Sequence, residues 1–122
     1  GSSFATPDGT AIRDFVHVSD IASAHVSAME QADRFQCATV NLGTNHGSSV
    51  REVIETVENI TGKKLQIELQ EARSGDPPIL VARNTLAMET LGWKPRYDLN
   101  QIISSAWEWH LSRLNKPLHN GF

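Results

Sequence analysis

The sequence of 122 residues lacks several features that mark particular classes of protein. Its single cysteine, Cys37, excludes a disulfide within the chain and favours a reducing, cytoplasmic location. No apolar run approaches the length needed to cross a membrane, and the N-terminal residues lead us to expect no secretory signal. The net charge of −3, from 11 basic and 14 acidic residues, argues against nucleic acid as the main partner.

Hydrophobic periodicity predicts a strand, a helix and a second strand in the first part of the chain. Residues 11–18 alternate between two faces, as in a strand whose faces are used differently. Ser19 or Asp20 can cap a helix that continues to about Ala32. A short strand is then expected over residues 39–42.

The clearest predicted helix follows a polar loop. Ser49 and Glu52 form a capping box, apolar residues recur at helical spacing, and Gly62 ends the helix. Alternation over residues 65–69 predicts a strand with one solvent-facing side. The remaining expected elements are a short extended run over residues 79–82, a small helix from Asn84 or Thr85 to Leu91, and a last helix that Asp98 caps and that continues to Leu114.

This order of elements, β-α-β-α-β-β-α-α, predicts a mixed α/β or α+β fold. The hydrophobic fraction of 39% and the charged fraction of 20% are ordinary for a globular protein. We expect a single domain over residues 1–116 and a flexible tail over residues 117–122. His17 and His25 fit no usual metal-ligand spacing, so we expect both to be hydrogen-bonded structural residues.

Four stretches of the chain resemble UDP-glucose 4-epimerases, in the same order and at matching spacing. They extend from about Phe4 to about Leu111 and comprise Thr6–His25, residues 40–43 with 49–54, Arg73–Pro77, and residues 91–95 with 107–110. The resemblance implies the C-terminal, substrate-binding part of an extended short-chain dehydrogenase fold, without the N-terminal Rossmann half.

The resemblance also implies three substrate-binding residues. In the family, the arginines at the positions of Arg13 and Arg73 bind the diphosphate of a UDP-sugar, and the aspartate matching Asp76 contacts the uridine ribose. A guanidinium is a planar fork of donors that fits phosphate oxygens, and a carboxylate can accept from both ribose hydroxyls. The residues alone leave other interpretations open, since Arg13 could pair with Asp14 at the surface, Arg73 could be solvated, and Asp76 could simply form a turn.

Two motifs that the resembled enzymes use in chemistry are not found in this sequence. Its eight glycines form neither Gly-x-x-Gly-x-x-Gly nor Gly-x-Gly-x-x-Gly, the turn that holds the NAD pyrophosphate. The family also uses a tyrosine base four residues before a lysine, whereas the only tyrosine, Tyr97, is followed at that spacing by Gln101. We therefore expect no catalytic residue, no cofactor and no metal in this chain, with NAD belonging to the parent family.

The resemblance favours a C-terminal nucleotide-sugar-binding fragment of a UDP-glucose 4-epimerase-like protein. The parent family interconverts UDP-glucose and UDP-galactose, and we expect this chain to bind UDP-sugars weakly and to be inactive alone. An alternative is a non-catalytic interaction or scaffold module that associates with itself. A further alternative is a chain that docks onto a separate Rossmann-domain chain to rebuild an enzyme.

Overall fold

The computed structural model describes residues 3–34 and 37–114, and the tail predicted over residues 117–122 lies outside these ranges. The elements in chain order are β1 (Ile12–Arg13), α1 (Val18–Glu30), the 3-10 helix η1 (Ala32–Arg34), β2 (Ser48–Ser49), α2 (Val50–Thr61), β3 (Ile79–Leu80), α3 (Thr85–Leu91) and α4 (Leu99–Leu114). This is the mixed α/β arrangement that the sequence predicts.

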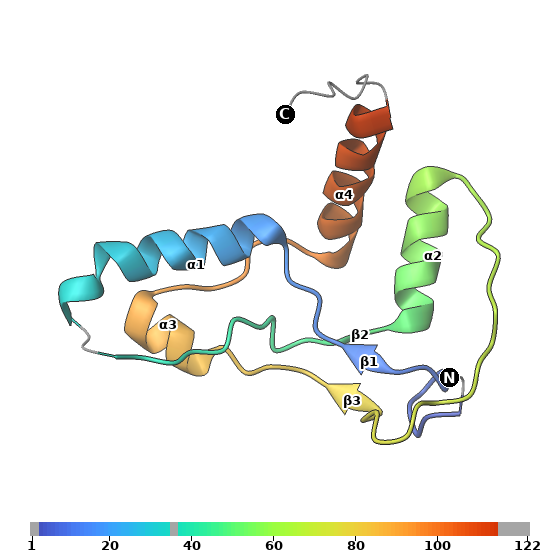
Figure 1. The fold of residues 1–122 in the computed structure, drawn as a ribbon, viewed down its shortest axis with the longest axis horizontal. Coiled ribbons are helices and arrows are strands. Elements are labelled where there is room, and N and C mark those ends of the chain that lie inside the picture. Colours follow the sequence, from blue (N-terminus) through green and yellow to red (C-terminus); the bar gives the residue numbers. More distant parts are fainter. Residues whose placement is uncertain (1–2, 35–36, 115–122) are drawn as a thin grey trace, which may run out of the picture.

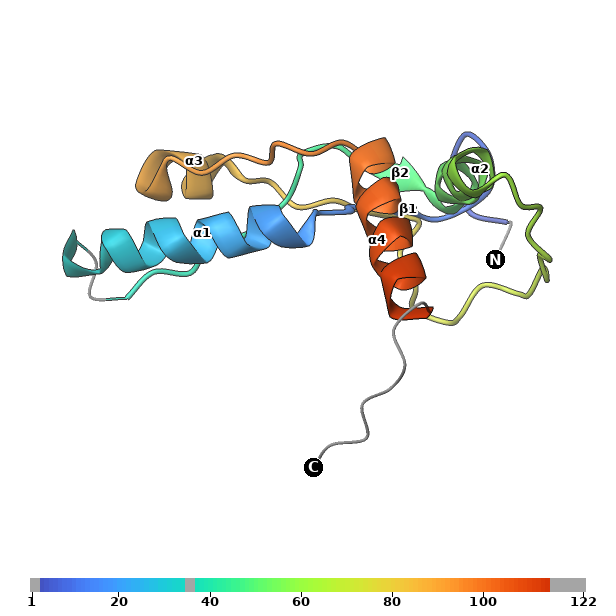
Figure 2. The ribbon, with the colours of Figure 1, turned by 90° about the horizontal axis from the view of Figure 1, so that it is seen from above.

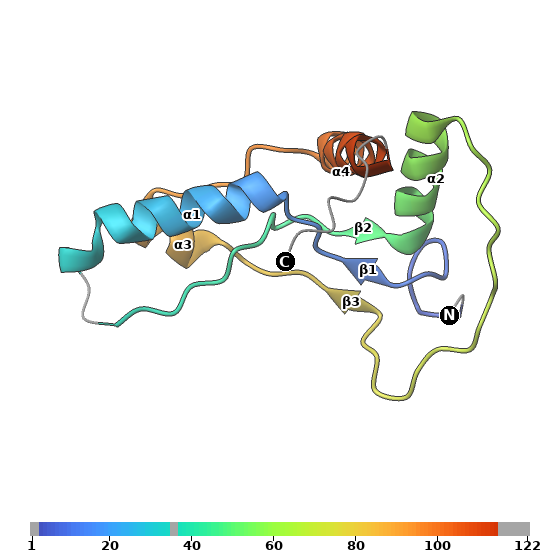
Figure 3. The ribbon, with the colours of Figure 1, turned by 45° about the horizontal axis from the view of Figure 1, so that its top comes forward.

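The three strands form a small mixed sheet with β1 in the middle (Figure 3). β1 pairs antiparallel with β2, so that Ile12 lies opposite Ser49 and Arg13 opposite Ser48. It pairs in parallel with β3, where Leu80 is the partner of Arg13. The register therefore places Arg13 on the central strand, flanked on both sides.

Two pairs of helices lie at opposite ends of the molecule (Figure 1). α1 contacts α3 at one end and α2 contacts α4 at the other, as the view from above also shows (Figure 2). A small core joins α1 to α3. Its buried residues are Ala24, Ala87 and Trp93, and the partly buried residues packed against them are Val16, Val40, Leu42 and Leu91.

The structure corrects the strand predictions. Of the run 11–18 only β1 joins the sheet, because beyond it the Asp14 side chain accepts the backbone bonds that a neighbouring strand would take. Residues 39–42 and 65–69 form no strand, since neither run has a ladder partner among the residues that the structure describes. Val40 and Leu42 of the first run instead pack against the core.

The predicted helix signals at α2 and α4 are confirmed. α2 starts with the reciprocal capping box of Ser49 and Glu52 and ends at Gly62, whose φ of 68° is one that glycine adopts readily. At the start of α4, the Gln101 N–H donates to the Asp98 carboxylate at 2.8 Å, and the Gln101 side chain accepts from the Asp98 N–H at 2.9 Å.

The start of α1 differs from the prediction, because His17 is the N-cap in place of Ser19 or Asp20. Nδ1 of His17 accepts the Ser19 N–H at 3.0 Å, and Nε2 lies 2.8 Å from the Ser105 hydroxyl of α4. The imidazole also stacks on Tyr97 with ring centroids 4.2 Å apart. His17 is thus the hydrogen-bonded structural histidine that the sequence predicts, and it links α1 to α4.

Asp20 serves a different purpose in the first turn of α1, where it is only 1% exposed. Its carboxylate accepts the backbone N–H of Arg96 at 3.1 Å and that of Tyr97 at 3.3 Å. Its own carbonyl accepts the indole N–H of Trp93 at 2.8 Å. Asp20 therefore fixes the segment that leads into α4 against the start of α1.

Replacing Asp20 by alanine should destabilise the fold. Asp20→Ala leaves the partly buried N–H groups of Arg96 and Tyr97 without their buried acceptor, which we expect to lower the free energy of unfolding by about 2–4 kcal/mol. Urea unfolding followed by tryptophan fluorescence measures the change. Glu89→Ala, an exposed position on α3, is the matched control and should change stability by less than about 0.5 kcal/mol.

Stability should fall in acid because of Asp8, in the turn before β1. The Ser49 hydroxyl, the Thr10 hydroxyl and the Thr10 N–H donate to the Asp8 carboxylate and hold its pKa below the ordinary value. A carboxyl whose pKa is depressed by folding stabilises the protein above its unfolded pKa, and the contribution is lost as pH falls through the folded pKa. Asp8→Asn should therefore flatten the slope of unfolding free energy between pH 5 and 3. An unaltered slope in Asp8→Asn would contradict this assignment.

Candidate functional site

The three residues that the resemblance singles out line one cavity of about 340 Å³. Arg13 enters it from β1, and Arg73 and Asp76 enter it from the loop that precedes β3. The other lining residues are Phe4, Ala11, Val50, Glu68, Gln70 and Glu71. The fold therefore brings together side chains that are far apart in the sequence.

Arg13 and Asp76 form an ion pair between Nη2 and Oδ1 across the cavity, and their side chains are 25% and 37% exposed. The second guanidinium nitrogen, Nη1, donates to the Ile12 carbonyl at 2.8 Å. Asp76 also sits in a turn, because its N–H donates to the Arg73 carbonyl at 3.2 Å around Gly75, whose φ is 81°. Asp76 thus both forms the turn and faces the cavity.

The alternative of an ion pair between Arg13 and Asp14 is wrong, since the Asp14 carboxylate has other partners. It accepts the Thr44 N–H at 3.0 Å, the Thr44 hydroxyl at 2.5 Å and the Ala82 N–H at 3.1 Å. These bonds join the residue that follows β1 to the segments that contain Thr44 and Ala82. Asp14 therefore fixes the main chain from which Arg13 projects.

The loop that contains Gly43 and Gly47 packs against the chain itself. A Cβ atom at Gly43 would lie 2.5 Å from the Ala82 carbonyl oxygen and 2.7 Å from the Asp14 carboxylate. At Gly47 it would lie 2.4 Å from a methyl of Ile12. A side chain at either position would clash with these atoms, so both positions require glycine. The loop is therefore a closely packed connection.

The charge balance of the cavity is the feature that sequence reasoning missed. Arg13 and Arg73 contribute two positive charges, whereas Asp76, Glu68 and Glu71 contribute three negative charges, for a net charge of −1. The one available signal was the polar side of the alternating run 65–69, which includes Glu68. Nothing in the sequence pattern indicates that this side faces the two arginines.

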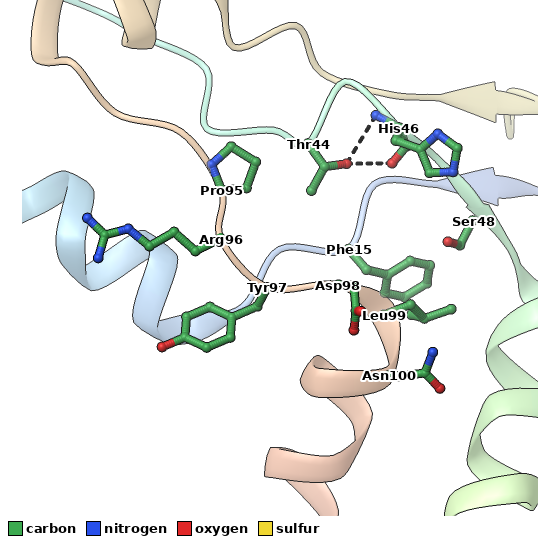
Figure 4. Close-up of a pocket in the computed structure, with 10 residues that line it drawn as sticks. All are labelled: Phe15, Thr44, His46, Ser48, Pro95, Arg96, Tyr97, Asp98, Leu99 and Asn100. Carbon is green, nitrogen blue, oxygen red and sulfur yellow. Dashed lines mark hydrogen bonds between the residues drawn. The ribbon is translucent and has the colours of Figure 1, made fainter.

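A second cavity of about 470 Å³ lies between the end of β1 and the start of α4 (Figure 4). It contains none of the predicted site residues. In Figure 4 the side chains of Arg96 and Tyr97 extend to the opposite side from Phe15 and Leu99. The remaining lining residues are Thr44, His46, Ser48, Pro95, Asp98 and Asn100. This mixture of groups defines no reaction centre by itself.

Residues 3–34 and 37–114 contain neither a cluster of metal ligands nor a membrane-spanning helix. In these ranges no three His, Cys, Asp or Glu side chains gather as a metal site. His25 contacts its own helix, with Nδ1 2.8 Å from the Ile21 carbonyl. Within the same ranges, no helix combines the length and apolar character needed to cross a bilayer.

Comparison with known proteins assigns the chain to a family. Residues 2–106 match the family described as GDP-mannose 4,6 dehydratase. The chain belongs to this family. Similar proteins include UDP-glucose 4-epimerases, which confirms the resemblance noted from the sequence motifs.

The similar epimerases are considerably longer than this chain. The enzyme of Rhizobium leguminosarum bv. trifolii is 43% identical over 111 residues, which are 90% of this chain and 34% of the relative. That of Streptomyces lividans is 45% identical over 92% of this chain and 34% of the relative. The Bifidobacterium longum enzyme, solved in complex with NAD+ and UDP, superposes with a TM-score of 0.86 at 35% identity, over 94% of this chain and 34% of that one. This GDP-mannose 4,6 dehydratase family member thus spans about a third of its relatives' length, in agreement with the predicted C-terminal region.

The two aspartates near Arg13 should differ in their effect on stability. Asp14→Ala removes the acceptor of partly buried donors and should lower the free energy of unfolding by about 2–3 kcal/mol. Asp76→Ala breaks only a partly exposed ion pair and should cost less than about 1 kcal/mol. Urea titration of both variants beside the wild type tests this order, and equal losses would contradict it.

Proposed function

We propose that this chain forms the part of a UDP-glucose 4-epimerase that holds the uridine diphosphate of the nucleotide sugar. Arg13 and Arg73 bind the diphosphate and Asp76 accepts from the ribose hydroxyls. The single observation that supports this proposal is the shared cavity, which unites an arginine of the central strand with an arginine and an aspartate 60 or more positions away. The presence of UDP in the similar Bifidobacterium longum structure agrees with this choice of ligand.

The charges of the cavity favour weak binding by the chain alone. A diphosphate must compete with Asp76 for Arg13, and Glu68 and Glu71 repel it. The exposure of Arg73 in its loop adds the entropic cost of ordering that side chain. These terms support a dissociation constant for UDP of around 1 mM, or about −4 kcal/mol.

The loop that contains Gly43 and Gly47 does not fit the pyrophosphate of NAD. Gly43 and Gly47, the loop glycines that most invite comparison with a phosphate loop, are packed against protein atoms. We therefore assign NAD and the tyrosine–lysine pair of the parent reaction to residues outside this sequence. NAD, when bound there, supplies the hydride acceptor for the interconversion of UDP-glucose and UDP-galactose in galactose metabolism. A cytoplasmic location belongs to the same proposal and is supported by the lone cysteine.

Exposed apolar side chains on α1 favour a second candidate, a module that binds another protein chain. Val18, Val26 and Met29 are 76%, 48% and 70% exposed and recur at helical spacing. A second copy of this chain or a separate Rossmann-domain chain would cover them. This candidate is compatible with the first, because the apolar stripe lies on α1 and not in the diphosphate cavity.

Calorimetric titration with UDP and with UDP-glucose tests the diphosphate site. We expect dissociation constants around 1 mM for the wild type and about tenfold weaker binding for Arg13→Ala, because a charge-assisted bond to phosphate is lost. Arg83→Ala removes an exposed arginine that does not line the cavity and is the matched control. Equal affinities of Arg13→Ala and the wild type would overturn the site.

A further inference from the structure

Most of the diphosphate cavity is built by one connecting segment, residues 63–76. This segment leaves the end of α2, passes outside that helix and returns below the sheet to β3 (Figures 1 and 3). Its contributions to the cavity wall are Glu68, Gln70, Glu71, Arg73 and Asp76. The position of Arg73 therefore depends on how the connecting segment is held.

The middle of the connecting segment has few attachments. Within the described part of the chain, no hydrogen bond ties residues 66–72 to any other residue. Ile67 and Leu69 face a cavity beside Ile54 of α2, but they remain 56% and 74% exposed. Contacts of this kind restrict the path of a chain much less than hydrogen bonds do, so its two ends determine where the segment lies.

At the beginning of the segment, Glu58 of α2 holds the main chain. Its Oε1 accepts the Leu65 N–H at 2.9 Å and its Oε2 accepts from Lys64 Nζ at 2.7 Å. The bond from Lys64 and then that from Leu65 lower the pKa of Glu58, so the carboxylate is charged at neutral pH. Lys63 adds a contact with α4, where its Nζ lies 5.2 Å from the centre of the Trp107 ring.

At the other end, the segment is attached to the sheet. Asp76 pairs with Arg13, and the Ile12 N–H donates to the Pro78 carbonyl at 2.8 Å. Arg73 lies next to this attached end. On its N-terminal side, the first described residue that is hydrogen-bonded to another part of the chain is Leu65.

We propose that Glu58 is a positioning residue for the nucleoside diphosphate site, acting through the main chain at Leu65 to hold Arg73 in the cavity wall. The inference rests on the proposed function of that cavity. The Leu65 contact carries most of the effect, because the Glu58 side chain is 16% exposed whereas that of Lys64 is 90% exposed. Without the Leu65 hydrogen bond, the stretch without hydrogen bonds begins near the end of α2. Binding of the diphosphate must then order a longer stretch of chain, at a larger cost in conformational entropy.

Two substitutions separate the roles of the carboxylate. Glu58→Ala removes the acceptor, whereas Glu58→Gln keeps a carbonyl oxygen that can still accept from Leu65. Asn59→Ala changes an exposed neighbour in the same turn of α2 and is the matched control. Each variant is studied by hydrogen–deuterium exchange, by UDP calorimetry and by urea unfolding, so that a local change is distinguished from a loss of fold.

We expect about tenfold faster exchange at Leu65 and about three- to tenfold weaker UDP binding in Glu58→Ala, with Glu58→Gln intermediate and Asn59→Ala like the wild type. Faster exchange with unchanged UDP affinity would overturn the positioning role, as would unchanged exchange. Failure of the wild type to bind UDP would instead reject the proposed function, and the role of Glu58 with it. Loss of affinity that tracks global stability equally in Glu58→Ala and Glu58→Gln would also reject the positioning role.

Discussion

The Asp14 carboxylate, which accepts main-chain N–H groups from two other segments, holds the centre of this structure. The sheet has strands of only two residues, so its ladders supply few hydrogen bonds. The Asp14 carboxylate compensates for these few bonds by accepting the N–H groups of Thr44 and Ala82, at positions where longer strands would have paired. Asp20 acts similarly at α1, where its carboxylate accepts the backbone N–H groups of Arg96 and Tyr97 in the segment before α4. Bonds to a charged acceptor are stronger than those between neutral groups, which suits a fold with so small a core.

The same constraint connects the fold to the candidate site. Arg13 directly precedes Asp14 in the chain. The main chain that carries its guanidinium is therefore fixed by strands on both sides and by the hydrogen bonds of Asp14. Gly43 belongs to this arrangement, because a side chain there would displace Ala82 or Asp14. A change in this packing would be transmitted to Arg13 through a few well-ordered bonds.

The sequence predicted the helices far better than the strands, and the reason is physical. Capping boxes such as Ser49 with Glu52 and the glycine at Gly62 are local signals, and the bonds they predict lie within a few residues. A strand exists only if another segment pairs with it, and residues 65–69 show how a good alternating pattern can lack a partner in the described chain. For the site, the family resemblance indicated Arg13, Arg73 and Asp76, and the fold brought them together. The partnership of Arg13 with Asp76 rather than Asp14, and the acidic wall of Glu68 and Glu71, depend on contacts distant in sequence that no local pattern encodes.

The two arginines of the cavity are therefore not equivalent. Arg13 stands on the central strand and is already oriented by Asp76 and by the Ile12 carbonyl. Arg73 stands on an exposed loop whose preceding stretch makes no hydrogen bond within the described residues. A diphosphate that bridges both would exchange the Arg13–Asp76 pair for bonds to phosphate and would have to order the loop as well. Any element that packs on this loop, whether part of the same protein or a partner, would reduce that entropic cost and raise affinity without adding a contact to the ligand.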